Sequence, residues 1–296
     1  MYVVTGATGN TGKPIALALL EAGKKVRIIS RNAEKVKELT DKGAELFQGS
    51  TDDVDLLKKA FDGETAVYAM IPVDFTAGDY TAFQMSHANA IAEALKGSSI
   101  KYLVSLSSQG AHLNSGSGVV LGLHKMEEIF NTIPGLSTLH LRPTYFMENT
   151  LGMIGLIKQA GIMGSPVKAN LNLSVIATKD IANYAAKRLL SLDFNGHCVQ
   201  NLLGAKDVTY SEMTKVFGTA IGKPDLNYVE FSFEDFKKSM MEQMGTSESV
   251  ANNMNEFISA LNDGKILELA NRDSESTTPT SIEDFAQTFA SLYNMS

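Results

Sequence analysis

The chain has one cysteine, no tryptophan and no run of basic residues. Because a lone cysteine cannot form a disulfide within the chain, we expect a protein of the reducing cytoplasm, with Cys198 buried and unreactive in a strand. Lysine and arginine number 26 against 33 aspartates and glutamates, a formal net charge of −7. Direct binding of nucleic acid is therefore disfavoured, since neutralising phosphates requires a basic patch.

Long apolar runs are also absent, and no stretch approaches the roughly 20 apolar residues that cross a bilayer. We therefore expect no membrane partner. The first apolar segment begins at Met1 or Tyr2, which leaves no room for a signal peptide and argues against export. The five histidines show no metal-ligand spacing, so no metal is expected. With 296 residues, 44% of them hydrophobic, the chain can form one lobed domain or two closely packed ones.

Three glycines at intervals of three residues follow a short apolar strand. Gly6, Gly9 and Gly12 stand between Val3-Val4 and the amphipathic run 14–20. This pattern is typical of a dinucleotide-binding turn, in which glycines permit the tight turn, the approach of a pyrophosphate and close helix packing. N–H groups at the helix start would face the phosphates. We predict that the cofactor is held by Gly6, Thr8, Gly9, Asn10, Thr11 and Gly12, the alternative being an ordinary glycine-rich turn.

Strand-like and helical segments alternate through the first half of the chain. We expect strands at 3–4, 26–29, 45–48, 65–71 and 101–106, with helices at 14–20, 33–41, 53–61, 80–96 and 125–132. The alternation predicts a Rossmann-type, doubly wound α/β fold, a parallel sheet covered on both faces. Residues 174–177 followed by 181–192 indicate a sixth strand–helix unit of the same lobe.

The rhythm changes after residue 143, which predicts a second lobe. We expect a dinucleotide-binding lobe of residues 1–150 joined by 173–203. A smaller, mainly helical substrate lobe would comprise residues 151–172 and 204–296. Capping boxes at 209–212 and 280–283 predict helix starts, and residues 246–253 indicate a linker or a mobile helix start.

The end of the second strand distinguishes the two nicotinamide dinucleotides. An acidic residue there would bind the ribose hydroxyls, but the chain has Ser30-Arg31-Asn32. Arg31 offers a planar fork for a 2′-phosphate. We therefore predict NADP(H) rather than NAD(H). A solvated arginine without a ligand is the alternative, and it predicts little difference in affinity between the two.

Three segments carry a family resemblance. Residues 5–12 (TGATGNTG), Arg31-Asn32 and residues 141–149 (LRPTYFMEN) resemble the NmrA-like branch of the atypical short-chain dehydrogenases/reductases. This branch includes bacterial NADPH-dependent quinone reductases and azoreductase-like proteins. His124 with Glu127-Glu128 resembles the His-x-x-x-Glu helix start of many members, and residues 177–182 resemble the family's Asp-Ile-Ala segment.

The resemblance implies positions for the rest of the cofactor. Residues after the fourth and fifth strands, 71–72 and 105–108, would line the nicotinamide side. Ser50 aligns where relatives often place an aspartate that meets the adenine amine, a role that Asp52 or Asp53 could take instead. Beyond the glycine loop and Arg31, the predicted cofactor contacts are Ser50, Ile71, Pro72, Ser105 and Pro143.

The Tyr-x-x-x-Lys pair of the wider superfamily is missing, since none of the nine tyrosines has a lysine four residues later. Sugar-nucleotide epimerase or dehydratase chemistry, which needs that base, is therefore disfavoured. The catalytic candidates are His124 as a proton donor, Ser107 as a hydrogen-bonding partner of a substrate carbonyl and Tyr145 as a pocket wall. For each of them a purely structural role is the alternative.

Two functions follow from these observations. The first is an NADPH-dependent oxidoreductase that passes a hydride directly to a small planar acceptor such as a quinone. The second is a non-catalytic NADP(H) sensor that regulates a protein partner, which the missing dyad motivates. A reductase or dehydratase acting on one specific metabolite is a third reading. Turnover separates the first from the second, because a sensor binds the cofactor without consuming it.

Overall fold

Seven parallel strands form the main sheet of the chain. The computed structural model describes residues 1–269 and 271–296. The sheet has the order β10-β6-β5-β4-β1-β2-β3, and every neighbouring pair is parallel. Its strands are β1 (Tyr2–Val4), β2 (Val26–Ser30), β3 (Glu45–Gln48), β4 (Ala66–Met70), β5 (Tyr102–Leu106), β6 (Ser137–Pro143) and β10 (His197–Leu202). The predicted doubly wound parallel sheet is confirmed.

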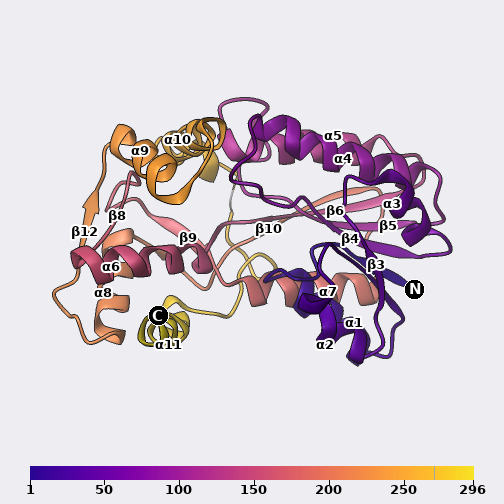
Figure 1. The fold of residues 1–296 in the computed structure, drawn as a ribbon, viewed down its shortest axis with the longest axis horizontal. Coiled ribbons are helices and arrows are strands. Elements are labelled where there is room, and N and C mark those ends of the chain that lie inside the picture. Colours follow the sequence, from indigo (N-terminus) through magenta and orange to yellow (C-terminus); the bar gives the residue numbers. More distant parts are fainter. Residues whose placement is uncertain (270) are drawn as a thin grey trace.

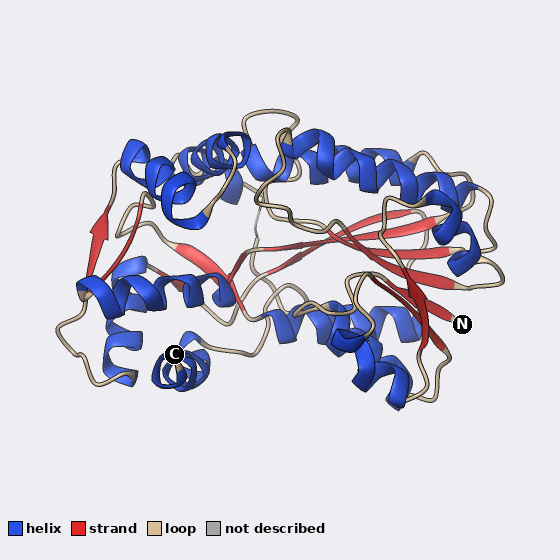
Figure 2. Ribbon diagram, viewed as in Figure 1, coloured by secondary structure: helices blue, strands red, loops and turns tan. Residues whose placement is uncertain are grey.

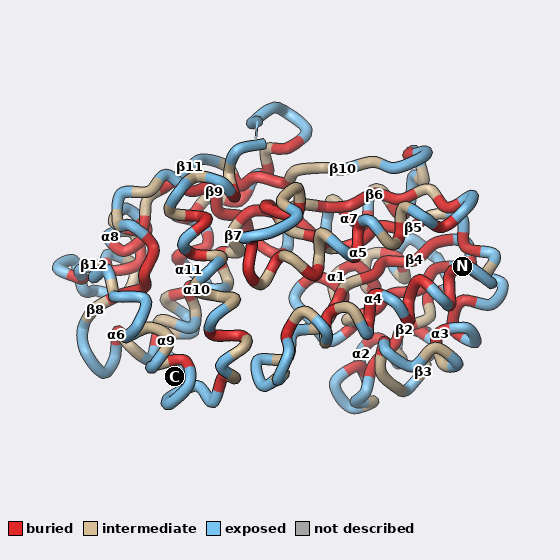
Figure 3. The backbone as a smooth tube through the Cα atoms, turned by 90° about the horizontal axis from the view of Figure 1, so that it is seen from above, coloured by how far each residue is buried: buried red, intermediate tan, exposed pale blue. Residues whose placement is uncertain are grey.

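Helices cover both faces of this sheet (Figure 1). One face carries α1 (Gly12–Glu21), α2 (Lys37–Asp41) and α7 (Thr178–Ser191), and the other carries α3 (Val54–Phe61), α4 (Tyr80–Lys96) and α5 (Leu121–Asn131). Short 3₁₀ turns, η1 (Glu34–Val36) and η2 (Gly118–Val120), precede α2 and α5. We call this assembly the sheet region. Its central strands are mostly buried, as strands covered on both faces must be (Figure 3).

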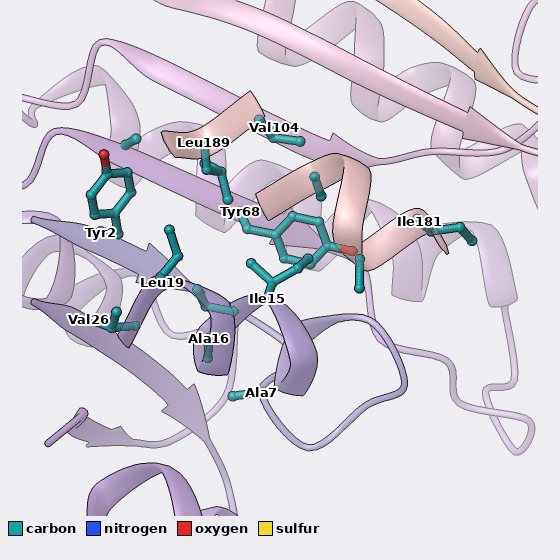
Figure 4. Packing of buried hydrophobic residues seen from close by; sticks show 14 of the residues in the cluster. Tyr2, Ala7, Ile15, Ala16, Leu19, Val26, Tyr68, Val104, Ile181 and Leu189 are labelled. Carbon is teal, nitrogen blue, oxygen red and sulfur yellow. The ribbon is translucent and has the colours of Figure 1, made fainter. Parts of the chain in front are cut away.

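Tyr68 of β4 organises the packing under α1. Its ring is fully buried beside Ile15 of α1, with Leu189 of α7 in the same cluster (Figure 4). The hydroxyl donates to Thr11 Oγ1 at 2.9 Å, so the only polar atom of this side chain has a partner. The start of α1 is thereby tied to the middle of the sheet.

The remaining elements form what we call the helical region (Figure 2). It contains two small sheets, ordered β11-β9-β7 and β12-β8. Its strands are β7 (Tyr145–Phe146), β8 (Ile162–Ser165), β9 (Leu173–Ile176), β11 (Asp207–Val208) and β12 (Asn227–Glu230). Its helices are η3 (Met147–Met153), α6 (Ile154–Ala160), α8 (Tyr210–Ala220), α9 (Phe233–Met244), α10 (Glu248–Asn262), η4 (Lys265–Leu267) and α11 (Ile282–Met295). The region has its own core, in which Phe217 and Phe289 stack at 4.2 Å.

The predicted sixth strand of the main sheet is wrong. Residues 173–176 do form a strand, but β9 pairs with β7 and β11 of the helical region. The main sheet is completed instead by β6 and β10. An apolar run predicts a buried strand without naming its partner, and that ambiguity explains the error. The predicted helix does follow, as α7. The lobe boundaries at 150, 173 and 203 stay a prediction.

Three local expectations also change. The second capping box joins Ser281 to Asp284, one residue later than predicted, because the Thr280 side chain binds Asp180 instead. Of the two alternatives for residues 246–253, the structure shows a helix start rather than a linker, since Ser247 caps α10. Cys198 is only partly buried, with its Sγ 3.4 Å from the carbonyl oxygen of Asn195. Within residues 1–269 and 271–296, no helix combines the length and apolarity that crossing a membrane requires.

Candidate active site

The turn between β1 and α1 is built from backbone. Gly6 has φ +64°, a conformation that favours glycine, and its carbonyl oxygen accepts the N–H of Gly9 at 2.9 Å. A Cβ on Gly12 would lie 2.3 Å from that same oxygen and 2.8 Å from the carbonyl oxygen of Thr5. No side chain therefore fits at Gly12. At the start of α1 the Lys13 N–H is taken by the Gly9 carbonyl oxygen at 3.2 Å, which leaves the N–H groups of Thr11 and Gly12 to offer to an anion.

The polar residues of the turn do not all face outward. Thr8, Gly9 and Asn10 are exposed, as residues that meet a cofactor must be. Thr11 is only 5% exposed, and its hydroxyl oxygen is occupied by Tyr68. The Thr11 side chain therefore serves the core, and the contact of Thr11 with the cofactor stays a prediction for its backbone. Only its backbone N–H remains for a phosphate.

Arg31 stands exposed just beyond β2, the strand next to β1. Across residues 1–269 and 271–296, no carboxylate forms an ion pair with its guanidinium. Asn32 is engaged locally, since its Oδ1 accepts the N–H of Lys35 at 3.1 Å. An exposed, unpaired guanidinium beside a donor-rich turn is well placed for a second phosphate.

The structure separates the two acidic residues after β3. Asp53 accepts the N–H of Leu56 at 3.0 Å and caps α3, so its carboxylate is already used. Asp52 is exposed, and a hydrogen bond from the Ser50 side chain holds its pKa below the usual range. Behind this loop, Thr51 Oγ1 lies 2.9 Å from His87 Nδ1 in the core. Asp52, supported by Ser50, is thus the carboxylate available on this side.

The predicted nicotinamide side is only partly accessible. Ile71 is 6% exposed and Pro72 is half-buried, both directly after β4. Pro143 is buried at the end of β6. Ser105 is fully buried, and its Oγ lies 2.7 Å from His140 Nδ1 on the neighbouring strand. The prediction of Ser105 as a cofactor contact is therefore wrong, because its hydroxyl is spent inside the protein.

Ser107 belongs to a buried charged network that the sequence did not reveal. Its hydroxyl donates to Glu127 Oε1 at 2.5 Å. Arg142 donates two hydrogen bonds to the same carboxylate, one from Nε at 3.0 Å and one from a terminal nitrogen at 2.5 Å. Ser107 and Glu127 are 3% and 5% exposed. With its proton donated to Glu127, Ser107 presents only lone pairs to a substrate in this arrangement.

His124 and Tyr145 lie in other surroundings. Since a carbonyl can only accept, His124 Nδ1 must donate to the oxygen of Ala111 at 2.9 Å, which leaves Nε2 free 3.5 Å from a Glu128 oxygen. Tyr145 packs edge to face against Tyr210 at 6.0 Å, and burial raises its pKa. Among the residues described, no hydrogen bond joins Ser107, His124 and Tyr145 to one another.

Gln109 was not singled out from the sequence. It is 5% exposed, and its Nε2 is a buried donor that has no partner within residues 1–269 and 271–296. It lines a cavity of about 160 Å³ together with residues of the helical region. A lone glutamine after a strand gives no sequence signal, so only the fold could identify it.

Comparisons with known proteins agree with this architecture. The NmrA-like family matches residues 2–286. The chain is 25% identical over 257 residues to an NAD(P)H azoreductase of Xenophilus azovorans, covering 87% of this chain and 86% of that protein. It is 27% identical over 243 residues to a (4-alkanoyl-5-oxo-2,5-dihydrofuran-3-yl)methyl phosphate reductase of Streptomyces griseus, covering 81% and 80%.

Solved structures share the fold along nearly the whole chain. The triphenylmethane reductase of Citrobacter sp., complexed with NADP(H), has a TM-score of 0.81 at 20% identity, covering 98% of this chain and 100% of that one. The NADPH-dependent quinone oxidoreductase of Escherichia coli, complexed with NADPH, has a TM-score of 0.79 at 20% identity, covering 97% and 99%.

Proposed function

The chain belongs to the NmrA-like family, and from that premise we propose that it is an NADPH-dependent oxidoreductase that reduces a small planar acceptor such as a quinone. The observation that carries the proposal is the β1–α1 turn. Gly12 has no room for a Cβ against the carbonyl of Gly6, and the turn exposes backbone donors. The relatives named above are reductases of conjugated small molecules.

The residues present fit NADPH. The donors of the turn suit a diphosphate, and the exposed Arg31 suits the additional 2′-phosphate. Asp52 would accept hydrogen bonds from the adenine amine. Ile71 and Pro72 would bound the nicotinamide on the side of β4. When bound, NADPH supplies the hydride, and the protein's part is to align the acceptor and to exclude water.

Proton delivery needs little from this protein. A reduced quinone oxygen resembles a phenol, with a pKa of about 10, so a modest donor or solvent suffices. His124 Nε2 is the donor that we propose: the Nδ1–H is held by the Ala111 carbonyl, so only the Nε2–H of the doubly protonated ring, beside the Glu128 carboxylate, can pass to the reduced oxygen. Glu127 and Arg142 would act as positioning residues that hold the Ser107 hydroxyl.

The proposal is tested with purified protein, NADPH or NADH, and a panel containing a naphthoquinone, an azo dye and a triphenylmethane dye. We expect NADPH oxidation well above the rate in buffer for at least one acceptor, with NADPH preferred over NADH. Calorimetric titration with NADPH and NADP⁺ is run beside it. Tight binding of either form with no turnover across the panel would favour the sensor, and no binding would defeat both functions.

A further inference from the structure

Gln109 is held rigidly between the two regions. Its backbone N–H donates to the carbonyl oxygen of Pro143 at 2.9 Å. The next residue, Gly110, has φ +91°, and a Cβ there would lie 2.8 Å from Ile266 Cδ1 in η4. The loop after β5 is thus packed directly against the helical region. The Gln109 side chain is 5% exposed, so its direction is set by the surrounding protein.

The buried amide of Gln109 needs a hydrogen-bond partner. Its Nε2 has none within residues 1–269 and 271–296. Leaving a buried donor unpaired costs about 1–3 kcal/mol, and native proteins seldom tolerate that cost without a water or a ligand. Thr144, which directly follows the Pro143 that anchors this loop, also has a buried hydroxyl with no partner in the part of the chain described. Unpaired polar groups therefore gather where β5 and β6 end.

The cavity beside Gln109 determines what kind of group it accepts. Arg272 in its wall donates to Gly204 O, Ser174 Oγ and Asp207 Oδ1, so its charge is balanced by Asp207 and both terminal nitrogens are engaged. Ser174 Oγ also accepts the N–H of Gly204 at 3.1 Å, which leaves its own O–H as a donor. Leu267 adds an apolar wall. The cavity offers donors without net charge, which suits a neutral carbonyl better than an anion.

We propose that Gln109 positions the acceptor by donating from Nε2 to a carbonyl oxygen that enters this cavity, with Ser174 as a second donor. The inference rests on the proposed function, since it names carbonyl-bearing planar molecules as the preferred acceptors. The volume of about 160 Å³ admits the carbonyl end of such a molecule. A triphenylmethane dye without a carbonyl would gain nothing from Gln109.

A matched pair of planar probes tests this assignment without turnover. Fluorenone and fluorene share one scaffold, and only fluorenone has a carbonyl. With NADP⁺ present, we expect the protein to bind fluorenone about 3- to 10-fold more tightly, the contribution of one hydrogen bond. Gln109→Leu should reduce that preference to about one. Gln109→Glu, which keeps the size but cannot donate when ionised, should do the same, and the exposed Gln159→Leu should change nothing.

The outcomes separate this proposal from the proposed function. Equal binding of both probes by the unaltered protein would mean that only water fills the cavity and would overturn the role of Gln109. A preference that survives in Gln109→Leu would overturn it as well. If Gln109→Leu fails to fold, Gln109→Glu decides. If the protein prefers fluorenone but does not oxidise NADPH, the proposed reductase function is contradicted and the role of Gln109 stands. If it oxidises NADPH but shows no preference for fluorenone, the role of Gln109 is contradicted and the reductase function stands.

In the turnover assay, the same variant should divide the acceptors by their chemistry. Gln109→Leu should raise KM for a naphthoquinone about 3- to 10-fold and leave KM for a triphenylmethane dye unchanged. An equal change for both acceptors would indicate a general structural effect and contradict a carbonyl-specific contact.

Discussion

The β1–α1 turn is made of backbone, whereas the network at the ends of β5 and β6 is made of side chains. Gly6, Gly9 and Gly12 act through the absence of a side chain, and the geometry of the turn is set within seven residues. Ser107, Glu127 and Arg142 meet from three separate elements and depend on burial for their effect. The first site is open and made to receive charge. The second is closed and holds its own charge, so the two respond to different perturbations.

The largest effect is expected where the closed network is broken. Glu127→Ala leaves the Arg142 guanidinium largely buried without its carboxylate and should lower the free energy of unfolding by about 3–5 kcal/mol. Chemical denaturation measures the loss. Glu128→Ala, one residue on and 67% exposed at its side chain, should change it by no more than about 0.5 kcal/mol. Similar losses of unfolding free energy in Glu127→Ala and Glu128→Ala would show that burial of the Glu127–Arg142 pair does not matter for stability.

The next largest effect is a loss of folding stability in acid, which we expect from the buried His140 on β6. Burial lowers the pKa of His140 to about 4, while an unfolded histidine titrates near 6.5. The unfolded chain therefore binds the proton more readily, and stability present above pH 6.5 falls as the pH drops toward 4. The total loss is about 3 kcal/mol.

Denaturation midpoints at several pH values measure this slope. His140→Leu should lower stability at neutral pH, because Ser105 loses its partner and Asn131 keeps only Thr138, yet flatten the dependence on pH. Burial also lowers the pKa of His87 and of His112, so a smaller slope of the same sign should remain. An unchanged slope in the variant would remove His140 as the source.

At the open site, Arg31→Ala should weaken NADPH binding about 10- to 100-fold, the contribution of a charge-assisted hydrogen bond. NADH affinity and protein stability should stay the same because the side chain is exposed. Titration calorimetry measures both cofactors. Lys59→Ala on α3 is the control for the loss of one surface cation, and unchanged NADPH affinity in Arg31→Ala would refute the 2′-phosphate assignment.

Among the variants that are expected to lower stability, the smallest loss is expected at the glycine turn. Gly12→Ala should cost about 1–3 kcal/mol, since the added methyl group presses on the carbonyls of Gly6 and Thr5. Cofactor binding should weaken in parallel. Gly97→Ala, where a Cβ meets nothing within 4 Å, is the matched control. Equal behaviour of the two variants in melting and titration experiments would show that close packing at Gly12 is unimportant.

The same contrast explains what could be predicted from the sequence. The glycine turn was recognisable because a backbone site is encoded by consecutive residues. That the hydroxyls of Thr11 and Ser105 are engaged in the core could not be predicted, because their partners are Tyr68, 57 positions away, and His140, 35 positions away. Gln109 was missed because its cavity closes only when distant segments meet.

For the helices and strands as well, local features could be predicted from the sequence and tertiary pairings could not. The parallel sheet was predictable from repeated strand–helix units, since each unit is local. The strand at 173–176 was predicted, but its partners were not, because pairing is a tertiary choice that apolar periodicity leaves open. Asp52 and Asp53 could not be told apart until the cap of α3 fixed one of them.

The last strand of the main sheet has a consequence for biosynthesis. β10 pairs with β6 along six residues, yet it is made only after the chain has left the sheet, built β7 to β9 and returned through α7. Until residue 202 emerges from the ribosome, β6 presents an unpaired edge that can capture another strand. A nascent chain stopped near residue 150 therefore exposes the edge of β6, through which it can aggregate. The risk ends only when β10 has been made and pairs with β6.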